Sequence, residues 1–287
     1  MNALCAAAFN ATSPARCFVA ESPRHDARFR FACDLRDAIQ REVFFMGRYE
    51  PQETALIEHF IKPGSVFVDV GANWGYFSLL AASRAGASGR VVAFEPDPRL
   101  VSILKRNIDL NGFNCVSAVQ AAAADRTAEL QLEGYDESNA NHGVSKLNSG
   151  IILAEKNVFT VVARKVDDVL DEMGVDHVDL VKMDIEGAED LALRGMDAGL
   201  KRGRFAALVL EIHPVQLAEK GRTVRDALDV LLVNGYSGWS VKHSFDDTRR
   251  AAYSQKLNVK DWLQQWSSET PLDSWPHMVW LAPGRSF

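Results

Sequence analysis

The chain has 287 residues, of which 47 % are hydrophobic and 24 % are charged, and its formal net charge is −6. This composition is typical of a soluble globular protein and excludes disordered and fibrous classes. The negative charge argues against nucleic acid or an anionic membrane surface as the main partner. No apolar run approaches the roughly 18 residues that a membrane helix needs, so no membrane span is predicted.

Cysteine usage indicates the compartment. The chain has four cysteines and no CxxC pair, so the cysteines suggest neither a zinc site nor a disulfide framework. A reducing, cytoplasmic location is therefore predicted. Residues 1–24 lack a basic n-region and a sustained apolar h-region, so we expect a loosely ordered leader and not a signal peptide.

The first elements along the chain are predicted to be helical. Residues 1–50 are expected to form an N-terminal helical extension, or lid. Residues 51–61 predict a helix, because Pro51 and Glu53 stand in its first turn and apolar residues follow at helical spacing. The sequence KPG at residues 62–64 ends this helix.

From residue 66 onward, short apolar strands alternate with helices. Continuous apolar strands in this alternation predict an α/β fold, with a parallel sheet covered by helices on both faces. The predicted strands are 66–70, 91–95, 116–121, 178–183 and 205–212, the predicted helices are 75–85, 98–111, 189–195 and 223–234, and a closing strand pair is predicted at 236–241 and 277–281.

Residues 125–175 break this rhythm between the third and fourth strands. The stretch GYDESNANHGVSKLNSG is rich in Gly, Asn and Ser, which predicts a loop-rich insert, and residues 159–162 could add a strand. Long loops inside compact domains are often functional. Asn139, His142 and Ser145 could therefore contact a hydroxylated substrate, although a solvated surface loop is the alternative for each of them.

The turn after the first strand has the sequence DVGANWG. Gly71 permits a tight turn and a close backbone approach, and Gly75 lets the next helix pack near the sheet. Ligands of open parallel sheets bind beyond the carboxyl ends of the strands, so we expect the amides of this turn to face a ligand. The GxGxxG pattern of a dinucleotide site is missing. Asp69, two residues before Gly71, suits a cationic or amino-acid-like ligand.

The second strand ends at Glu95, which Pro96 follows. An acid at this position hydrogen-bonds the ribose hydroxyls of adenosine ligands. S-adenosylmethionine has a ribose for Glu95 and an ammonium and carboxylate end for the region of Asp69. A turn with a purely structural role is the alternative. The combination of two acids and spaced glycines favours cofactor binding.

Acidic residues and a histidine follow the fourth and fifth strands. Asp184 and Glu186 come directly after the fourth strand, and His213 ends the fifth. Methyl transfer to an alcohol gains from a positioned base, and the ordinary histidine pKa near 6.5 suits that role. We therefore expect Asp184, Glu186 and His213 to be catalytic, with His213 also contacting the substrate. A histidine that merely caps a strand is the alternative.

The carboxylates of Asp184, Glu186 and Glu189 leave two interpretations open. They could bind a divalent metal that lowers the pKa of a bound hydroxyl. Alternatively, one is a catalytic acid and the others begin a helix, where the macrodipole favours acids. The second interpretation is preferred, so a site without metal is predicted and Glu189 is expected to be a helix-start residue.

Four motifs in chain order carry a resemblance to a known family. The chain resembles the FkbM-like S-adenosylmethionine-dependent methyltransferases over residues 49–214, in the motifs VFVDVGANWGYFS, AFEPDP, LVKMDIEGAE and EIHP. A weaker similarity extends to MVWLAP near the C-terminus. The resemblance implies a class I methyltransferase Rossmann-like fold over residues 51–287, with a seven-stranded, mostly parallel sheet whose last strand is reversed. It also implies methyl transfer, usually to a hydroxyl of a sugar, polyketide or other natural product.

The resemblance further implies which residues bind the cofactor. The glycine motif would hold the methionine end, the strand-two acid would hold the ribose, and two alanines after the third strand would line the adenine. Two residues of GRYEPQE would close over the cofactor, and Asp184 would face the reaction zone. The implied residues are Tyr49, Glu53, Asp69, Gly71, Ala72, Asn73, Gly75, Glu95, Pro96, Ala122, Ala123 and Asp184.

The sequence therefore predicts an O-methyltransferase that uses S-adenosylmethionine and a small hydroxylated substrate. An N-methyltransferase and a non-catalytic scaffold of the same fold are the alternatives. A nicotinamide dehydrogenase is disfavoured because GxGxxG is missing and because it gives no reason for Asp69. A homodimer is possible.

Overall fold

A computed structural model of the chain describes residues 17–22, 27–134, 146–147, 158–254 and 257–287. Three residues that the sequence analysis proposed for substrate binding, Asn139, His142 and Ser145, lie outside the described residues. So do residues 1–16 of the expected leader. Among the residues that the structure describes, no helix combines the length and the apolar character needed to cross a membrane.

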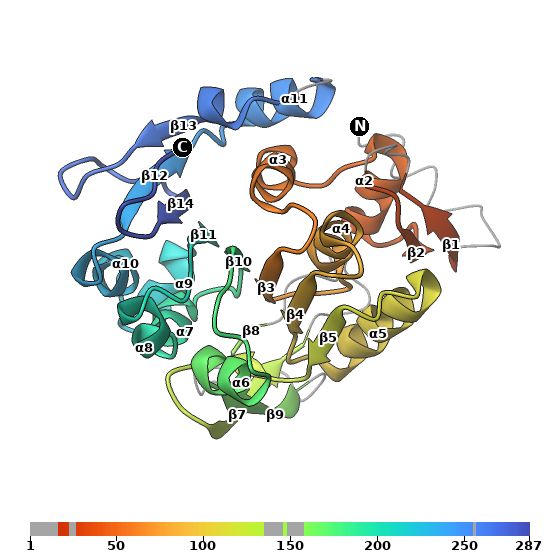
Figure 1. The fold of residues 1–287 in the computed structure, drawn as a ribbon, viewed down its shortest axis with the longest axis horizontal. Coiled ribbons are helices and arrows are strands. Elements are labelled where there is room, and N and C mark those ends of the chain that lie inside the picture. Colours follow the sequence, from red (N-terminus) through yellow and green to blue (C-terminus); the bar gives the residue numbers. More distant parts are fainter. Residues whose placement is uncertain (1–16, 23–26, 135–145, 148–157, 255–256) are drawn as a thin grey trace.

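The main sheet confirms the predicted α/β architecture. Its strand order is β13-β12-β14-β11-β10-β3-β4-β5 (Figure 1). Five strands pair in parallel, and β14 runs antiparallel to both of its neighbours. The sheet has eight strands where seven were expected, because the short strand β13 pairs with the edge of β12. The bounds are β3 (Val66–Val70), β4 (Arg90–Phe94), β5 (Val116–Val119), β10 (Leu180–Met183), β11 (Ala207–Glu211), β12 (Ser237–Val241), β13 (Leu263–Gln265) and β14 (His277–Leu281).

Helices cover both faces of this sheet, as the continuous apolar strands predict (Figure 1). Because successive side chains of a strand point to opposite faces, Phe67 and Val68 belong to different cores. Phe67 packs with α3 (Pro51–Phe60) and α4 (Tyr76–Ala85). Val68 packs with the helices on the other face. The remaining helices are α5 (Pro98–Asn111), α6 (Val166–Glu172), α7 (Glu189–Arg194), α8 (Asp197–Lys201), α9 (Pro214–Glu219), α10 (Val224–Val233), α11 (Phe245–Tyr253) and η1 (Val259–Trp262).

The insert between the third and fourth strands of the main sheet is more regular than expected. Its described residues form β7 (Ala128–Glu133), β8 (Lys146–Leu147) and β9 (Val158–Arg164), which join β6 (Ala122–Ala123) in a second sheet, and they continue into α6. The possible strand at 159–162 is therefore confirmed as part of β9. The sequence analysis missed β7, although AELQLE alternates apolar and polar residues as a half-exposed strand does.

The N-terminal extension is only partly helical. It begins with a hairpin of β1 (Cys17–Glu21) and β2 (Arg30–Asp34) and continues into α2 (Ala38–Met46). The hairpin packs on the domain: the Phe31 ring stacks on Trp74 with 5.2 Å between centroids, and the Ala32 amide donates to Asn107 Oδ1 of α5 over 2.8 Å. The extension therefore shares the core of the domain that follows it.

Candidate active site

A cavity lies at the carboxyl ends of the parallel strands. Strands β3, β4, β10 and β11 supply its floor, α2 supplies Ile39, and the segment before α3 supplies one wall. Most of the residues expected at a cofactor site line this cavity, namely Tyr49, Gly71, Ala72, Asn73, Glu95, Pro96, Ala122, Ala123 and Asp184. Glu186, expected to be catalytic, lines it too.

The glycine turn does not present its amides to the cavity as we expected. The amides of Gly71 and Ala72 both donate to the carbonyl of Phe94, and the Asn73 amide donates to Glu95 Oε2. The next two amides also donate within the turn. The glycine instead lets the turn pack closely against the backbone that follows β10. Gly71 has φ +88°, and a Cβ there would lie 2.0 Å from the Asp184 carbonyl oxygen.

Glu95 is fixed in place by two backbone amides. Its Oε2 accepts from the Asn73 amide over 2.8 Å and its Oε1 accepts from the Asp97 amide over 2.9 Å. Burial raises the pKa of Glu95 to about 7, and the two amide hydrogen bonds oppose that rise. The carboxyl group is therefore held rigidly at the cavity wall, where the sequence analysis expected it.

Asp69 and Gly75 belong to the glycine motif but do not line the cavity. Asp69 is buried on β3, and its Oδ2 accepts from the Ser78 hydroxyl of α4 over 2.6 Å. Its placement differs from the expectation of a carboxylate that meets the ligand. Gly75, at φ +104°, lets α4 approach α5, because a Cβ there would meet Leu104 at 2.6 Å.

Backbone strain is concentrated at this cavity. Among the described residues, the non-glycine residues with positive φ are Glu50 (42°), Asn73 (54°) and Glu186 (53°). All three line the cavity. Strained backbone of this kind costs energy and gathers at functional sites, so its position supports the assignment of the cavity as the site.

Lys182 is a site residue that the sequence analysis did not assign. It is buried, its Nζ donates to Asp184 Oδ2 over 3.0 Å, and it lies over the Phe77 ring. Burial lowers its pKa, but the charges of Asp184 and Glu50 outweigh burial and raise it. A lysine inside the apolar strand LVKM, two residues before Asp184 and so on the same face, is the signal that could have found it.

Glu50 and Glu211 complete the charged wall around Lys182. Both line the cavity. Burial raises the pKa of Glu50 to about 7, and burial together with the Asp184 charge raises the pKa of Glu211 well above its ordinary value. This end of the cavity therefore holds more carboxyl groups than cations, which favours a positively charged ligand.

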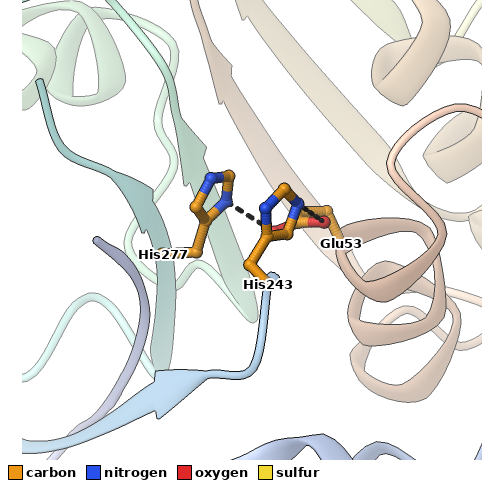
Figure 2. A group of neighbouring side chains, drawn as sticks. All are labelled: Glu53, His243 and His277. Atoms are coloured by element: carbon orange, nitrogen blue, oxygen red, sulfur yellow. Dashed lines mark hydrogen bonds and ion pairs between the residues drawn. The ribbon is translucent and has the colours of Figure 1, made fainter. Parts of the chain in front are cut away.

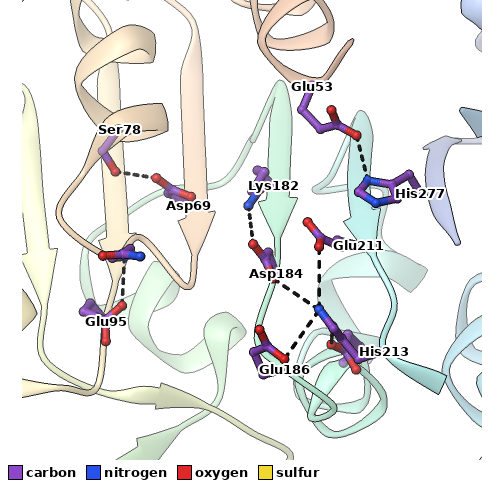
Figure 3. A network of polar contacts seen from close by, with 12 residues as sticks. Glu53, Asp69, Ser78, Glu95, Lys182, Asp184, Glu186, Glu211, His213 and His277 are labelled. Carbon is purple, nitrogen blue, oxygen red and sulfur yellow. Dashed lines mark hydrogen bonds and ion pairs between the residues drawn. The ribbon is translucent and has the colours of Figure 1, made fainter. Parts of the chain in front are cut away.

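His213 does not line the cavity but lies directly behind its carboxylates. Its Nδ1 donates to Glu189 Oε1 over 2.8 Å, while its Nε2 faces Asp184, Glu186 and Glu211 at 3.6 to 3.8 Å (Figure 3). Within the described part of the chain, that Nε2 has no hydrogen-bond partner. Glu189 is therefore more than the helix-start residue that we expected, since it orients the imidazole.

The carboxylates of the DIEGAE segment do not converge as a metal site. Glu189 turns towards His213 Nδ1, and Glu186 Oε2 accepts from Gln216 Nε2 over 3.0 Å. Asp184 and Glu211 do lie close to His213. There, however, the Lys182 ammonium already provides a cation beside Asp184.

Glu53 is the third expected cofactor residue that does not line the cavity. It stands in the first turn of α3 and is 1 % exposed. Its Oε1 accepts from His277 Nδ1 over 2.7 Å. This carboxylate therefore lies beneath the wall that Tyr49 forms and does not close over a ligand.

Comparison with known proteins identifies the family. Residues 69–237, more than half of the chain, match the model of the methyltransferase FkbM domain. The chain belongs to the FkbM family of S-adenosylmethionine-dependent methyltransferases. The FkbM-like resemblance is thereby confirmed, and the strand order with its reversed β14 is the class I methyltransferase fold that this family implies.

Three relatives of the FkbM family illustrate the similarity. "Methyltransferase 1" of Beauveria bassiana is 32 % identical over 152 residues, which cover 46 % of this chain and 59 % of the relative. The 31-O-demethyl-FK506 methyltransferase FkbM of Streptomyces tacrolimicus is 29 % identical, covering 54 % and 68 %. The 2-O-methyltransferase NoeI of Sinorhizobium fredii is 26 % identical, covering 59 % and 72 %. The chain spans three fifths or less of the length of several relatives.

Proposed function

We propose that this FkbM-family protein transfers the methyl group of S-adenosylmethionine to a hydroxyl of a small molecule, such as a carbohydrate or a secondary metabolite. One observation carries the proposal. A single cavity joins a fixed carboxyl group, Glu95, at the ends of β3 and β4 to a charged group around Asp184 and His213 at the ends of β10 and β11.

The first end suits the adenosine part of the cofactor. Glu95 would accept hydrogen bonds from the ribose hydroxyls, as an acid at the end of a second strand does in dinucleotide-binding folds. Ala122 and Ala123 offer an apolar surface for the adenine beside it. Gly71 lines the cavity without a side chain, so the ligand can approach its backbone. A side chain there would clash with the Asp184 carbonyl just after β10.

The second end suits the sulfonium and ammonium groups of the cofactor. The carboxyl groups of Glu50, Asp184 and Glu211 outnumber the single ammonium of Lys182, and a cationic ligand would favour the ionised forms of Glu50 and Glu211, whose pKa values are raised without it. The rings of Tyr49 and Phe77 line the same wall, and aromatic faces attract cations. The cofactor supplies an activated methyl group, so the protein mainly has to align the acceptor with it.

His213 and Asp184 would act on the acceptor. Asp184 lines the cavity and would accept a hydrogen bond from the acceptor hydroxyl, which positions it for in-line attack. Its Oδ1 lies 3.8 Å from His213 Nε2. The proton of the hydroxyl would pass to Asp184 as the new bond forms and from Asp184 to that Nε2, and Glu189 on Nδ1 would stabilise the resulting imidazolium.

The names of two relatives support oxygen as the acceptor atom, because one is the 2-O-methyltransferase NoeI and the other is the 31-O-demethyl-FK506 methyltransferase FkbM. An N-methyltransferase and a cofactor-binding scaffold without turnover are the alternatives. We further propose a small-molecule partner and a cytoplasmic location, and we retain the homodimer as a possibility. The negative net charge, which argues against nucleic acid as the main partner, supports the first of these.

The test is methyl transfer from radiolabelled S-adenosylmethionine to a panel of hydroxylated acceptors and matched amines. The proposal expects label in hydroxyl-bearing sugars or polyketides and release of one S-adenosylhomocysteine per methyl transferred. Label only in amines would support the N-methyltransferase. Cofactor binding with no transfer to any acceptor would support the scaffold.

A further inference from the structure

A second group of polar side chains, two of them buried and one half-buried, lies outside the cavity and has no part in the proposed reaction. It consists of Glu53, His243 and His277 (Figure 2). Glu53 belongs to the first turn of α3, His243 follows β12, and His277 begins β14. These residues are widely separated in the chain, so the fold itself brings them together.

Glu53 forms a hydrogen bond with one histidine of this group and faces the other without one. Glu53 Oε1 accepts from His277 Nδ1 over 2.7 Å, but Glu53 Oε2 and His243 Nε2 stand 3.7 Å apart. Neither of these last two atoms has a hydrogen-bond partner among the residues that the structure describes. Glu53 is 1 % exposed, so such an atom would cost about 1–3 kcal/mol unless a ligand satisfies it.

The two imidazole rings also have an unusual mutual arrangement. The rings of His243 and His277 stack almost in parallel, with 3.7 Å between centroids and 11° between planes. Each directs one ring nitrogen towards the carboxylate of Glu53 (Figure 2). One donor atom from each of the three side chains lies within 4.8 Å of the others.

We propose that Glu53, His243 and His277 bind a divalent transition-metal ion, with Zn²⁺ as the ion that this donor set fits best. Two imidazole nitrogens and one carboxylate oxygen are ligands that Zn²⁺ takes at about 2.0–2.2 Å. Donor atoms at such distances from one ion lie about 3–4 Å apart from each other, which agrees with the 3.7 Å between His243 Nε2 and Glu53 Oε2. The 2.7 Å hydrogen bond between His277 Nδ1 and Glu53 Oε1 would lengthen as the ion replaces its proton.

The charges around the group favour a cation. Glu50, which lines the cavity, lies three residues before Glu53, and Glu211 is paired with His277 across the β11–β14 ladder. Among the described residues, Glu53 forms its ion pairs with His243 and His277 and with no lysine or arginine. At the other His–carboxylate group, Lys182 already neutralises Asp184. A metal is therefore better placed at Glu53 than in the cavity.

The ion would connect α3 to β14 and to the segment that follows β12. Gln52, next to Glu53, already donates to the carbonyl of Lys242 over 3.1 Å, so α3 and the segment after β12 meet at this point without the ion. Because Tyr49 and Glu50 directly precede α3 and line the cavity, the ion would hold that wall in position. This inference stands independently of the proposed reaction.

Metal binding by the full-length protein tests the proposal. The protein is stripped with a chelator and titrated with Co²⁺, whose visible absorption reports histidine and carboxylate ligation, and then with Zn²⁺ by calorimetry. The test variant is His243→Gln, because His243 is the most exposed of the three residues, with 21 % of its side chain exposed. The matched control is His213→Gln, which alters the other His–carboxylate group.

We expect the wild-type protein to bind at least one equivalent of Co²⁺ and of Zn²⁺. His243→Gln should lose one equivalent or bind it at least tenfold more weakly, and His213→Gln should keep it. Zn²⁺ should raise the melting temperature of the wild type but not that of His243→Gln. No binding by the wild type, unchanged binding by His243→Gln, or loss in His213→Gln instead would each overturn the proposal.

Discussion

The two halves of the cavity differ in whether their polar groups have hydrogen-bond partners in the protein. At the ends of β3 and β4, the polar groups that line the cavity are satisfied by the protein: both oxygens of Glu95 and the amides of Gly71, Ala72 and Asn73 have partners. At the ends of β10 and β11, Glu211 Oε2 and His213 Nε2 are buried and have no hydrogen-bond partner within the described ranges.

This difference suggests a division of labour. A rigid, satisfied wall suits a ligand that must be held in one place, because little freedom is lost when it binds. Unsatisfied buried groups store electrostatic energy that a reacting charge can release. We therefore assign binding to the β3–β4 half and chemistry to the β10–β11 half, and the predictions below are designed to separate the two.

The largest expected effect comes from His213→Ala. Removing a positioned general base typically lowers the rate of proton-coupled transfer by about 10²–10⁴-fold. We expect kcat to fall within that range while the affinity for S-adenosylhomocysteine stays within about twofold, because His213 does not line the cavity. Single-turnover kinetics and calorimetry measure the two quantities. Full activity in this variant would remove the base from the account.

The second prediction concerns the stability of the β3–β4 half. Burial raises the pKa of Asp69 from 3.8 to about 6, and Lys182 and the Ser78 hydrogen bond partly offset this. The folded protein therefore holds this proton more tightly than the unfolded chain does. That stabilising contribution is complete below about pH 3.8 and is lost as the pH rises through 6.

Asp69→Asn should therefore stabilise the protein without cofactor at pH 8 by up to about 3 kcal/mol, since one pKa unit corresponds to about 1.4 kcal/mol. The amide oxygen can still accept from Ser78. Urea unfolding at pH 8 and at pH 4.5 measures the difference, which should shrink at the lower pH. An equal effect at both values would show that the Asp69 charge is not the cause.

The third prediction separates binding from chemistry at Glu95. Glu95→Ala should weaken binding of S-adenosylhomocysteine about tenfold or more, because hydrogen bonds to a charged group contribute roughly 1.5–3 kcal/mol each. At saturating cofactor, kcat should change much less. Glu133→Ala, on the exposed face of β7, serves as the control. Unchanged affinity in Glu95→Ala would remove the ribose assignment.

The smallest effect is expected from Glu189→Gln. Burial lowers the pKa of His213, but the hydrogen bond to Glu189 and the charges of Asp184 and Glu186 raise it above 6.5 overall, and Glu211 also faces the ring. A base must be neutral to act, so activity should rise with pH through this pKa. The variant should shift that rise to lower pH and lower the plateau several-fold. An unmoved profile would mean that another group titrates.

The sequence predicts best where local chemistry decides the structure. The helix expected at 98–111 coincides with α5 because three signals agree. Asp97 caps the first turn by accepting from the Arg99 amide, Pro98 stands at the first helical position, and Gly112 ends the helix at φ +63°. The cavity-lining part of the glycine motif and Glu95 also follow from strand and turn signals.

The sequence predicts poorly where distant segments decide the structure. The role of Glu189 depends on His213, which lies 24 residues further along the chain, and Glu53 meets His277 across 224 residues. Neither partner is visible in a local pattern. The hairpin of the N-terminal extension and β7 were also missed. Their strands are short and half-exposed, so few apolar residues distinguish them from loops.

Calorimetric titration of the wild type and of His213→Ala with S-adenosylhomocysteine, with NAD as the control ligand and the methyl-transfer rate measured beside it, tests most directly whether the two halves of the cavity divide binding from chemistry. The account predicts that both proteins bind S-adenosylhomocysteine with similar affinity, that neither binds NAD, and that only the wild type transfers methyl at a normal rate. Loss of binding in His213→Ala, or no binding by the wild type, would contradict it.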